Sequence, residues 1–197
     1  MTESLGWWAS VRADHRALQG SRDRYDDRFE APVIETSTGA IIRDLATNVG
    51  FQQMAVFRLS QAFARRGVTP LAMLVSRAIR HLYGAEMHWE AAIEPGVVIV
   101  HGNGLVVSRA AAVGPDCILS QHVTLGISVG SDGRPAGAPR LGSNVFVGPG
   151  AALIGPIEVG ANSKVAPNAV VMSDVPADSV VRPADTVVQQ RSKRAAG

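Results

Sequence analysis

The chain has 197 residues, of which 46% are hydrophobic and 18% charged, so its size and composition are those of one soluble domain, or of one domain with an appendage. A formal net charge of +2 does not favour a nucleic-acid partner, and the basic residues near the C-terminus are expected to lie in a solvated tail. A single cysteine excludes an intrachain disulfide and a cysteine-based metal site, and no apolar run is long enough to cross a membrane. The start of the chain lacks the pattern of a signal peptide, so we expect a cytoplasmic protein without membrane contact.

Residues 1–84 are expected to form an N-terminal region that is helical from about residue 41. The residues before that point show no clear periodicity. Apolar residues then recur at three- and four-residue spacing up to Gly67, which predicts one amphipathic helix. A second helix is predicted from a proline that follows Thr69, its expected cap, up to Gly84. We expect this helical region to pack against the rest of the chain or a partner subunit rather than a membrane.

From Gly84 onwards a large aliphatic residue returns at every sixth position. The series is unbroken over residues 141–176, where the hexads begin with Leu141, Val147, Leu153, Val159, Val165 and Val171. A period of six fits neither an amphipathic helix nor one long strand, and it is typical of a parallel β-helix. Each hexad supplies a short strand with an inward aliphatic residue, then a residue that turns the corner. The fold class is therefore mainly β, with the β-helix over residues 85–178 and a C-terminal tail over residues 179–197.

The repeat is interrupted twice. The phase holds up to Ile99, but the next residue in phase is Val107, so two extra residues fall around His101. After Gly126 the segment ISVGSDGRPAGAP has no aliphatic spacing, which predicts a loop extruded from the solenoid at about residues 127–140. Loops that leave a rigid scaffold are common places for functional sites. The two interruptions are therefore where chemistry is expected.

Among the five histidines, His101 is the strongest candidate for catalysis because it stands at the first interruption, next to a glycine. A neutral imidazole can take a proton from a hydroxyl near pH 7. A base of this kind usually has a carboxylate on its other ring nitrogen. Glu86, fifteen residues earlier and close to one coil of three hexads, is the candidate partner.

Four segments carry a resemblance to a known family: Glu86-Met87-His88, PGVVIVHGNGLVVS, QHVTLG and GPIEVGANSKVAPNAVVMSDVP. Over about residues 77–188 the chain resembles the serine O-acetyltransferase family of hexapeptide-repeat acyltransferases. The resemblance implies a left-handed parallel β-helix, usually trimeric, that binds acetyl-CoA as acyl donor between neighbouring β-helices. It places the family's catalytic histidine at His101 and its acidic partner at Glu86. By this resemblance His101 would deprotonate the acceptor hydroxyl, and backbone N–H groups near the loop would stabilise the oxyanion.

The resemblance also assigns residues to the acyl donor, although glycine and proline at hexad corners are equally required by the turns. The predicted donor-binding residues are Gly126, Ile127 and Ser128 at the pantetheine arm, Gly148 and Pro149 at the channel wall, and Lys164 and Pro167 at the nucleotide end of coenzyme A.

The acceptor side departs from the family pattern. The serine-specific enzymes have an aspartate just before the catalytic histidine, where this chain has Val100. They also have an Arg-His pair at the end of the extruded loop, where this chain has a glycine and Ala138. Losing charge-assisted contacts of this type costs on the order of a few kcal/mol each. We therefore expect a sugar, polysaccharide or other small alcohol as acceptor, bound near His88, His122 and Ala138.

Three alternative functions are compatible with a β-helix fold. The first is a serine or homoserine O-acetyltransferase whose loop recognises the acceptor differently, and the second is a non-catalytic β-helix scaffold. The third, a zinc enzyme of the γ-carbonic anhydrase type, would need a His-x4-His pair that the sequence lacks, so no metal is expected. Flat faces rich in alanine and valine favour packing on symmetry mates, which predicts a homotrimer with sites between subunits.

Overall fold

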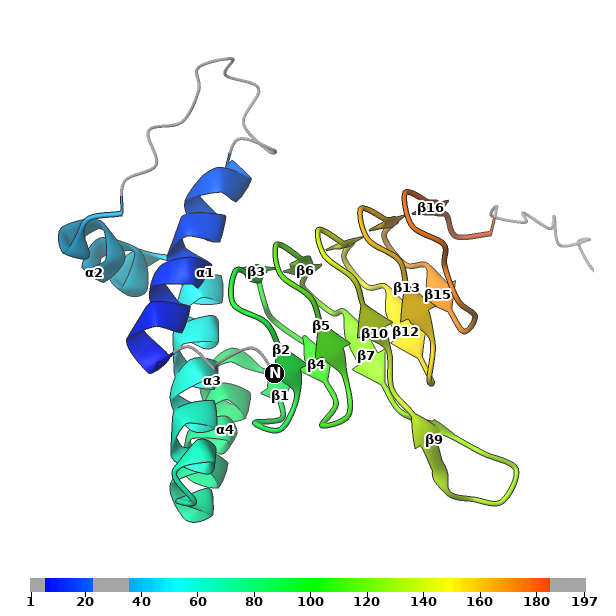
Figure 1. Cartoon of the computed structure of the whole chain (residues 1–197), viewed down its shortest axis with the longest axis horizontal. Coiled ribbons are helices and arrows are strands. Elements are labelled where there is room, and N and C mark those ends of the chain that lie inside the picture. The colour runs from blue at the N-terminus through cyan, green and yellow to red at the C-terminus, as the bar shows by residue number, and fades with distance from the viewer. Residues whose placement is uncertain (1–5, 23–35, 185–197) are drawn as a thin grey trace, which may run out of the picture.

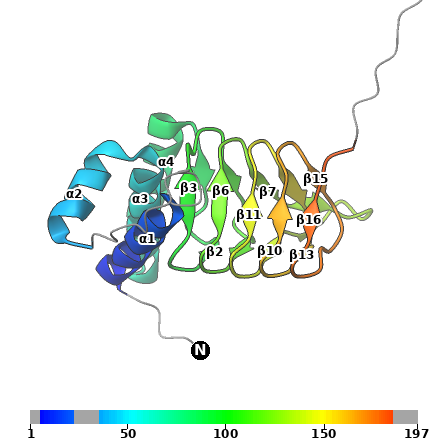
Figure 2. The same ribbon diagram turned by 90° about the horizontal axis from the view of Figure 1, so that it is seen from above.

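The chain forms a parallel β-helix with four α-helices packed at the end where the solenoid begins (Figure 1). The structure is a computed structural model, and it describes residues 6–22 and 36–184. Seen from above in Figure 2, the coils follow one another along a single axis away from the helices.

Three parallel sheets, called here A, B and C, form the faces of the solenoid. Sheet A contains β1 (Glu86–Met87), β4 (Val106–Val107), β7 (Thr124–Gly126), β12 (Ala152–Ile154) and β15 (Val170–Val171). Sheet B contains β2 (Ala92–Ile93), β5 (Ala112–Val113), β10 (Arg140–Leu141) and β13 (Glu158–Val159). Sheet C contains β3 (Val98–Val100), β6 (Ile118–Ser120), β11 (Phe146–Val147), β14 (Lys164–Val165) and β16 (Val180–Val181).

The aliphatic residue that opens each hexad points into the solenoid, which confirms the predicted six-residue pattern. All thirteen of these residues, from Met87 to Val171, are at most 5% exposed. They stack on one another because the strands pair in register: Met87 lies beside Val107, and Leu125 beside Leu153. Each strand has only two or three residues, so its stability depends on backbone hydrogen bonds to the coils on either side and on this shared core.

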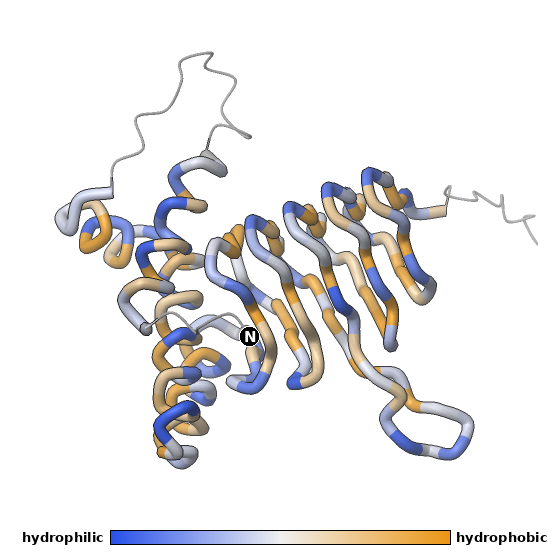
Figure 3. Tube along the Cα trace, in the orientation of Figure 1, coloured by the Kyte–Doolittle hydropathy of each residue, from blue (hydrophilic) through white to orange (hydrophobic). Residues whose placement is uncertain are grey.

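The spacing of paired residues locates both interruptions. Met87 pairs with Val107, twenty residues later, whereas the regular coil from Val107 to Leu125 takes eighteen. The two extra residues therefore belong to the first coil, as predicted. The second interruption is a hairpin, not an irregular loop: β8 (Ser128–Val129) pairs antiparallel with β9 (Pro135–Gly137). Figures 1 and 3 show it projecting from the solenoid with hydrophilic residues at its tip.

The helical region begins well before the expected residue 41. Its elements are α1 (Trp7–Arg22), α2 (Thr38–Thr47), α3 (Val49–Arg65) and α4 (Thr69–Tyr83). The single helix predicted up to Gly67 is two helices, because Asn48 is extended and its side chain accepts a hydrogen bond from the N–H of Phe51. Val68, rather than Thr69, is the N-cap of α4. Gly84 ends the helix as predicted, in a left-handed conformation with φ of 61°.

The β-helix continues past residue 178, where a tail was expected, because β16 adds a strand beside β14. The expectation that the basic residues 191–194 are solvated falls outside the described residues. Among the residues that are described, no helix is long and apolar enough to span a bilayer.

A buried ion pair attaches α1 to α3 and to the first coil. Asp14 accepts hydrogen bonds from the Arg58 Nε at 2.9 Å and Nη2 at 3.1 Å, and a third from the N–H of Gly96 at 2.8 Å. The remaining guanidinium donors reach the carbonyl oxygens of Ile93 and Glu94 and the side-chain Oε1 of Gln61. The side chains of Asp14 and Arg58 are 1% and 2% exposed, so water does not stabilise either charge. Each charge is stabilised by the opposite charge of its partner instead.

Replacing Arg58 by methionine tests this connection. The change leaves the Asp14 carboxylate buried without its counter-charge, which typically costs about 3–5 kcal/mol. We expect the free energy of unfolding, measured by urea denaturation monitored by circular dichroism, to fall by that amount.

The matched control is Arg109→Met. Arg109 pairs with Glu90 at 3.1 Å, but the two side chains are 67% and 49% exposed. Exposed pairs of this kind contribute at most about 1 kcal/mol. Equal losses of stability in the two variants would contradict a special role for the Asp14–Arg58 pair.

Candidate functional site

The two extra residues of the first coil form a bulge that holds His101 at the surface. His101 follows β3 directly and has a left-handed backbone with φ of 59°, uncommon for a residue other than glycine. Its carbonyl oxygen accepts a hydrogen bond from the N–H of Asn103, which closes the bulge. The His101 side chain is exposed. The two extra residues of the first coil therefore place the His101 imidazole on the surface of the solenoid.

A groove of about 990 Å³ opens beside His101. One wall comes from α1 and from the junction of α2 and α3, and the other from β3, β6 and the corner after β11. Ser120, Gln121, Phe146 and Pro149 line it together with His101. No aspartate, glutamate, lysine or arginine is among the described residues that line this groove. Its walls therefore offer apolar surface and neutral hydrogen-bonding groups.

The corner after sheet C brings several predicted residues into one line. The pairing of β6, β11 and β14 sets Gln121, Pro149 and Pro167 at equivalent places on three successive coils, and His101 directly follows β3 at the same corner of the first coil. Coils in a parallel sheet are about 4.8 Å apart, so this line is about 14 Å long. Lys164, on β14, lies three residues before Pro167 and is exposed. We call this row the C–A line.

Contacts along the C–A line are close. A Cβ atom at Gly148 would lie 2.8 Å from the nitrogen of Pro167, so these two predicted donor residues touch through their backbones. His122 also lies on this corner, with φ of 57°, and its N–H donates to the carbonyl of Asn103 at 2.8 Å. A Cβ at Gly104 would meet the His122 ring. The structure thus brings His122 to the His101 bulge.

The other predicted residues lie on a second row, at the corner after sheet A. His88 follows β1, and the paired strands β1, β4 and β7 place it level with Ser108 and Gly126. Ile127 packs partly against the core at this corner, and Ser128 begins the hairpin. We call this row the A–B line. The predicted donor residues are therefore divided between two edges of sheet A.

His88 has a charged and aromatic environment. Its ring stacks on Trp89 with centroids 4.1 Å apart, and its Nδ1 accepts a hydrogen bond from the N–H of Glu90 at 3.2 Å. Partial burial lowers the pKa of His88, with Glu90 acting in the opposite direction and Arg109 adding to the decrease. Both the lowered pKa of His88 and the hydrogen bond from the N–H of Glu90 to Nδ1 favour the neutral imidazole.

Glu86 does not contact His101, contrary to expectation. Within residues 6–22 and 36–184 no hydrogen bond or ion pair joins the two side chains, and Glu86 Oε2 lies 2.6 Å from Arg80 Nη2 instead. Arg80 is in the last turn of α4, six residues before Glu86. The pair is more than half exposed on both sides and adds little stability.

Ala138 is also placed differently from the expectation. It is 6% exposed and belongs to the hydrophobic core, because the chain re-enters the solenoid at this point after the hairpin. Its methyl group therefore packs in the core of the solenoid instead of lining the groove beside His101.

Gln121 is a groove residue to which the sequence analysis gave no role. Its Oε1 is buried and, in the part of the chain that the structure describes, has no hydrogen-bond partner. Gln121 is the first residue of the QHVTLG segment that carries the family resemblance. Its position beside His101 follows only from the pairing of neighbouring coils, which the sequence alone does not show.

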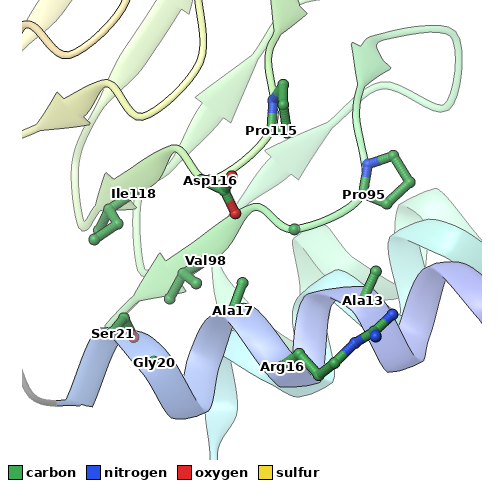
Figure 4. Close-up of a pocket in the computed structure, with 11 residues that line it drawn as sticks. Ala13, Arg16, Ala17, Gly20, Ser21, Pro95, Val98, Pro115, Asp116 and Ile118 are labelled. Atoms are coloured by element: carbon green, nitrogen blue, oxygen red, sulfur yellow. The ribbon is translucent and has the colours of Figure 1, made fainter.

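A smaller groove of about 480 Å³ lies between α1 and the corners that precede β3 and β6 (Figure 4). Arg16 and Asp116 are its charged residues, and it includes none of the predicted site residues. In the described ranges no group of three or more histidine, cysteine, aspartate or glutamate side chains is arranged to hold a metal ion.

Comparison with known proteins identifies the family. A family model described as bacterial transferase hexapeptide (six repeats) matches residues 138–172. A serine acetyltransferase of Synechococcus elongatus is 36% identical over 134 residues, 67% of this chain and 53% of that protein. One from Helicobacter pylori is 35% identical over 144 residues, 72% of this chain and 83% of that protein. The chain belongs to the serine acetyltransferase family.

Solved structures of this family agree. Soybean serine acetyltransferase complexed with serine has a TM-score of 0.72 and 28% identity, covering 94% of this chain and 71% of that one. The Neisseria gonorrhoeae enzyme in complex with serine has a TM-score of 0.72 and 25% identity, covering 88% and 65%. The family resemblance and the left-handed parallel β-helix are thereby confirmed. The chain spans about half the length of the Synechococcus relative.

Cys117 is predicted to be unreactive in the folded protein. The side chain is fully buried, with Sγ 3.1 Å from the carbonyl oxygen of Gly142. Burial raises its pKa to about 11, because the thiolate would lose its hydration. We expect no reaction with a chromogenic disulfide reagent at pH 8, and one thiol per chain after denaturation in guanidinium. Rapid labelling of the native protein would contradict the burial of this thiol.

Proposed function

We propose that this chain is an O-acetyltransferase that moves an acetyl group from acetyl-CoA to a hydroxyl, with His101 as general base. The observation that carries the proposal is the exposed His101 bulge beside an uncharged groove in a member of this family. The neutral imidazole takes the hydroxyl proton as the oxygen attacks the thioester carbonyl. The C–S bond then breaks, and the coenzyme A thiolate takes the proton from the imidazolium.

Acetyl-CoA lies along the C–A line in this proposal. Pro149 and Pro167 form a continuous wall from His101, and Lys164 is a cation near the far end for a phosphate of the nucleotide. The line is about 14 Å long, which suits an extended pantetheine arm. The groups of the A–B line, Gly126 and Ser128 among them, then act from a second copy of the chain. A homotrimer would bring the two lines together.

L-serine is the acceptor that the relatives favour, because they are named serine acetyltransferases and two of the solved structures hold serine. None of the described residues that line the groove carries a charge for the serine ammonium or carboxylate. Charged groups do occur on the A–B line, where Glu90 and Arg109 are exposed beside His88. Serine recognition therefore depends on the composite site between copies.

A neutral alcohol or sugar is the second candidate acceptor. Val100 precedes the proposed base, and the Ala138 methyl group is in the core, so neither position supplies a counter-charge. Apolar walls with neutral polar groups suit a ligand that has hydroxyls and no net charge.

Replacing His101 by asparagine tests the base. Asparagine tolerates the left-handed backbone of this position, so the bulge should persist while the imidazole is lost. We expect kcat/KM to fall by about 10²–10⁴, measured by release of free coenzyme A thiol in the presence of acceptor. His81→Asn, at an exposed position near the end of α4, is the control and should keep full activity. Equal activity of both variants would refute a catalytic role for His101.

A panel of acceptors tests specificity. L-serine, L-homoserine, glycerol and glucose are compared at equal acetyl-CoA, with the acetylated products identified by mass spectrometry. We expect kcat/KM for L-serine to exceed that for the neutral compounds by at least about tenfold, since charge-assisted contacts add recognition energy. A neutral compound that outperforms serine would favour the second candidate. Thioester consumption by none of them would support the scaffold alternative.

A further inference from the structure

Gln53 of α3 has an unusual environment for a polar side chain. It is 0% exposed, and among the residues that the structure describes neither Oε1 nor Nε2 has a hydrogen-bond partner. Buried amides without partners are rare in folded proteins, because the hydration lost on burial is not replaced. An apolar side chain of the same length would avoid that cost. The Gln53 amide therefore does not serve the stability of the fold, which points to a role in function.

The Gln53 amide lies directly against the bulge that carries His101. A Cβ atom at Gly102 would be 1.6 Å from Gln53 Oε1 and 2.7 Å from Nε2, so only a residue without a side chain fits beneath the amide. One helical turn earlier, a Cβ at Gly50 would be 2.0 Å from the carbonyl oxygen of Ile99. Helix α3 therefore contacts the chain on both sides of His101.

The bulge is held from its other side by the second coil. The His122 N–H donates to the carbonyl of Asn103, and the His122 ring lies against Gly104. His101 itself is exposed, and the direction of its side chain follows from the backbone on which it stands. A shift of Gly102 therefore rotates the imidazole relative to the groove.

We infer that Gln53 is a positioning residue for His101, whose buried amide fixes the backbone of Gly102 and so directs the imidazole into the groove. Gln53 acts through Gly102 and is not itself a catalytic residue. The inference rests on the proposed function of His101 as the base. It makes α3 part of the catalytic apparatus, although the helix lies outside the β-helix.

The decisive variant is Gln53→Met, which keeps the length of the side chain and removes both polar atoms. Removing unpaired polar atoms from a buried site is neutral or stabilising, so the Tm should stay unchanged or rise by about 2–4 °C. Loss of positioning should nevertheless reduce kcat by about 10- to 100-fold. KM for acetyl-CoA should change by less than about twofold, because the donor contacts of the C–A line are intact. Higher stability together with lower kcat is a result that a purely structural role would not produce.

Gln61→Met is the matched control on the same helix. Both polar atoms of the Gln61 amide have partners, since Nε2 donates to the carbonyl oxygen of Ala91 at 3.0 Å and Oε1 accepts a hydrogen bond from Arg58 Nη1 at 3.2 Å. The substitution should lower the Tm, because the Ala91 carbonyl loses its donor and Arg58 Nη1 loses an acceptor, and leave kcat per folded molecule unchanged. The two glutamines are thus expected to have opposite effects on stability and on turnover.

A second readout does not need activity. The His101 ring signals in a ¹H–¹³C correlation spectrum, assigned by their loss in His101→Asn, should move in Gln53→Met and stay in place in Gln61→Met. Unchanged kcat and unchanged His101 signals in Gln53→Met would overturn the inference. A loss of kcat that only follows the folded fraction would overturn it too. If His101→Asn keeps full activity, the proposed function fails, whereas the ring signals still decide whether Gln53 positions His101.

If Gln53→Met does not fold, Gln53→Asn serves in its place with the same readouts. It keeps the amide but withdraws it from Gly102 by one methylene group. We expect the same fall in kcat and the same movement of the His101 signals. Wild-type values for both would overturn the inference.

Discussion

The register between neighbouring coils is the constraint on which this structure depends. Strands of two or three residues cannot stand alone, so each one exists only because the coils beside it supply its hydrogen bonds and its core neighbours. The inward residues of sheet A stack in register: Met87, Val107, Leu125, Leu153 and Val171. Because this register is shared by whole coils, it also fixes which residues lie next to one another in the other sheets and at the corners. Residues far apart in the sequence thereby become neighbours along an edge. The C–A and A–B lines are direct results of that register.

The candidate site lies where the six-residue repeat is interrupted while the coils keep their register. Two extra residues in the first coil are accommodated by the left-handed His101 and the adjacent glycines, and the coil then resumes its phase at Val107. This bulge occurs in the coil on which the helices pack. It therefore has protein on two sides, α3 and the second coil, and an open groove on the third. A bulge in a middle coil would have lacked the helical wall.

The hexads, the two interruptions and His101 could be predicted from the sequence because each depends on local spacing. Helix α1 could not, because its buried residues include Ser10, Asp14, His15 and Gln19, which give no apolar stripe. Asp14 is compatible with burial only through Arg58, forty-four residues later. The ion pair of Glu86 with Arg80 depends on where α4 ends. The inward methyl of Ala138 depends on how a hairpin rejoins the coil.

The packing of α3 and α4 on the first coil also has a consequence for solubility. The first coil of a β-helix would otherwise present unpaired backbone groups in all three sheets, which is a template for another chain to add strands. The close approach of Gly50 to the Ile99 carbonyl leaves no room for such a strand beside β3. The helices therefore close one end of the solenoid, as terminal repeats do in other repeat proteins. This cap keeps the stacking of coils within one molecule, so that growth by addition of further molecules is blocked at that end.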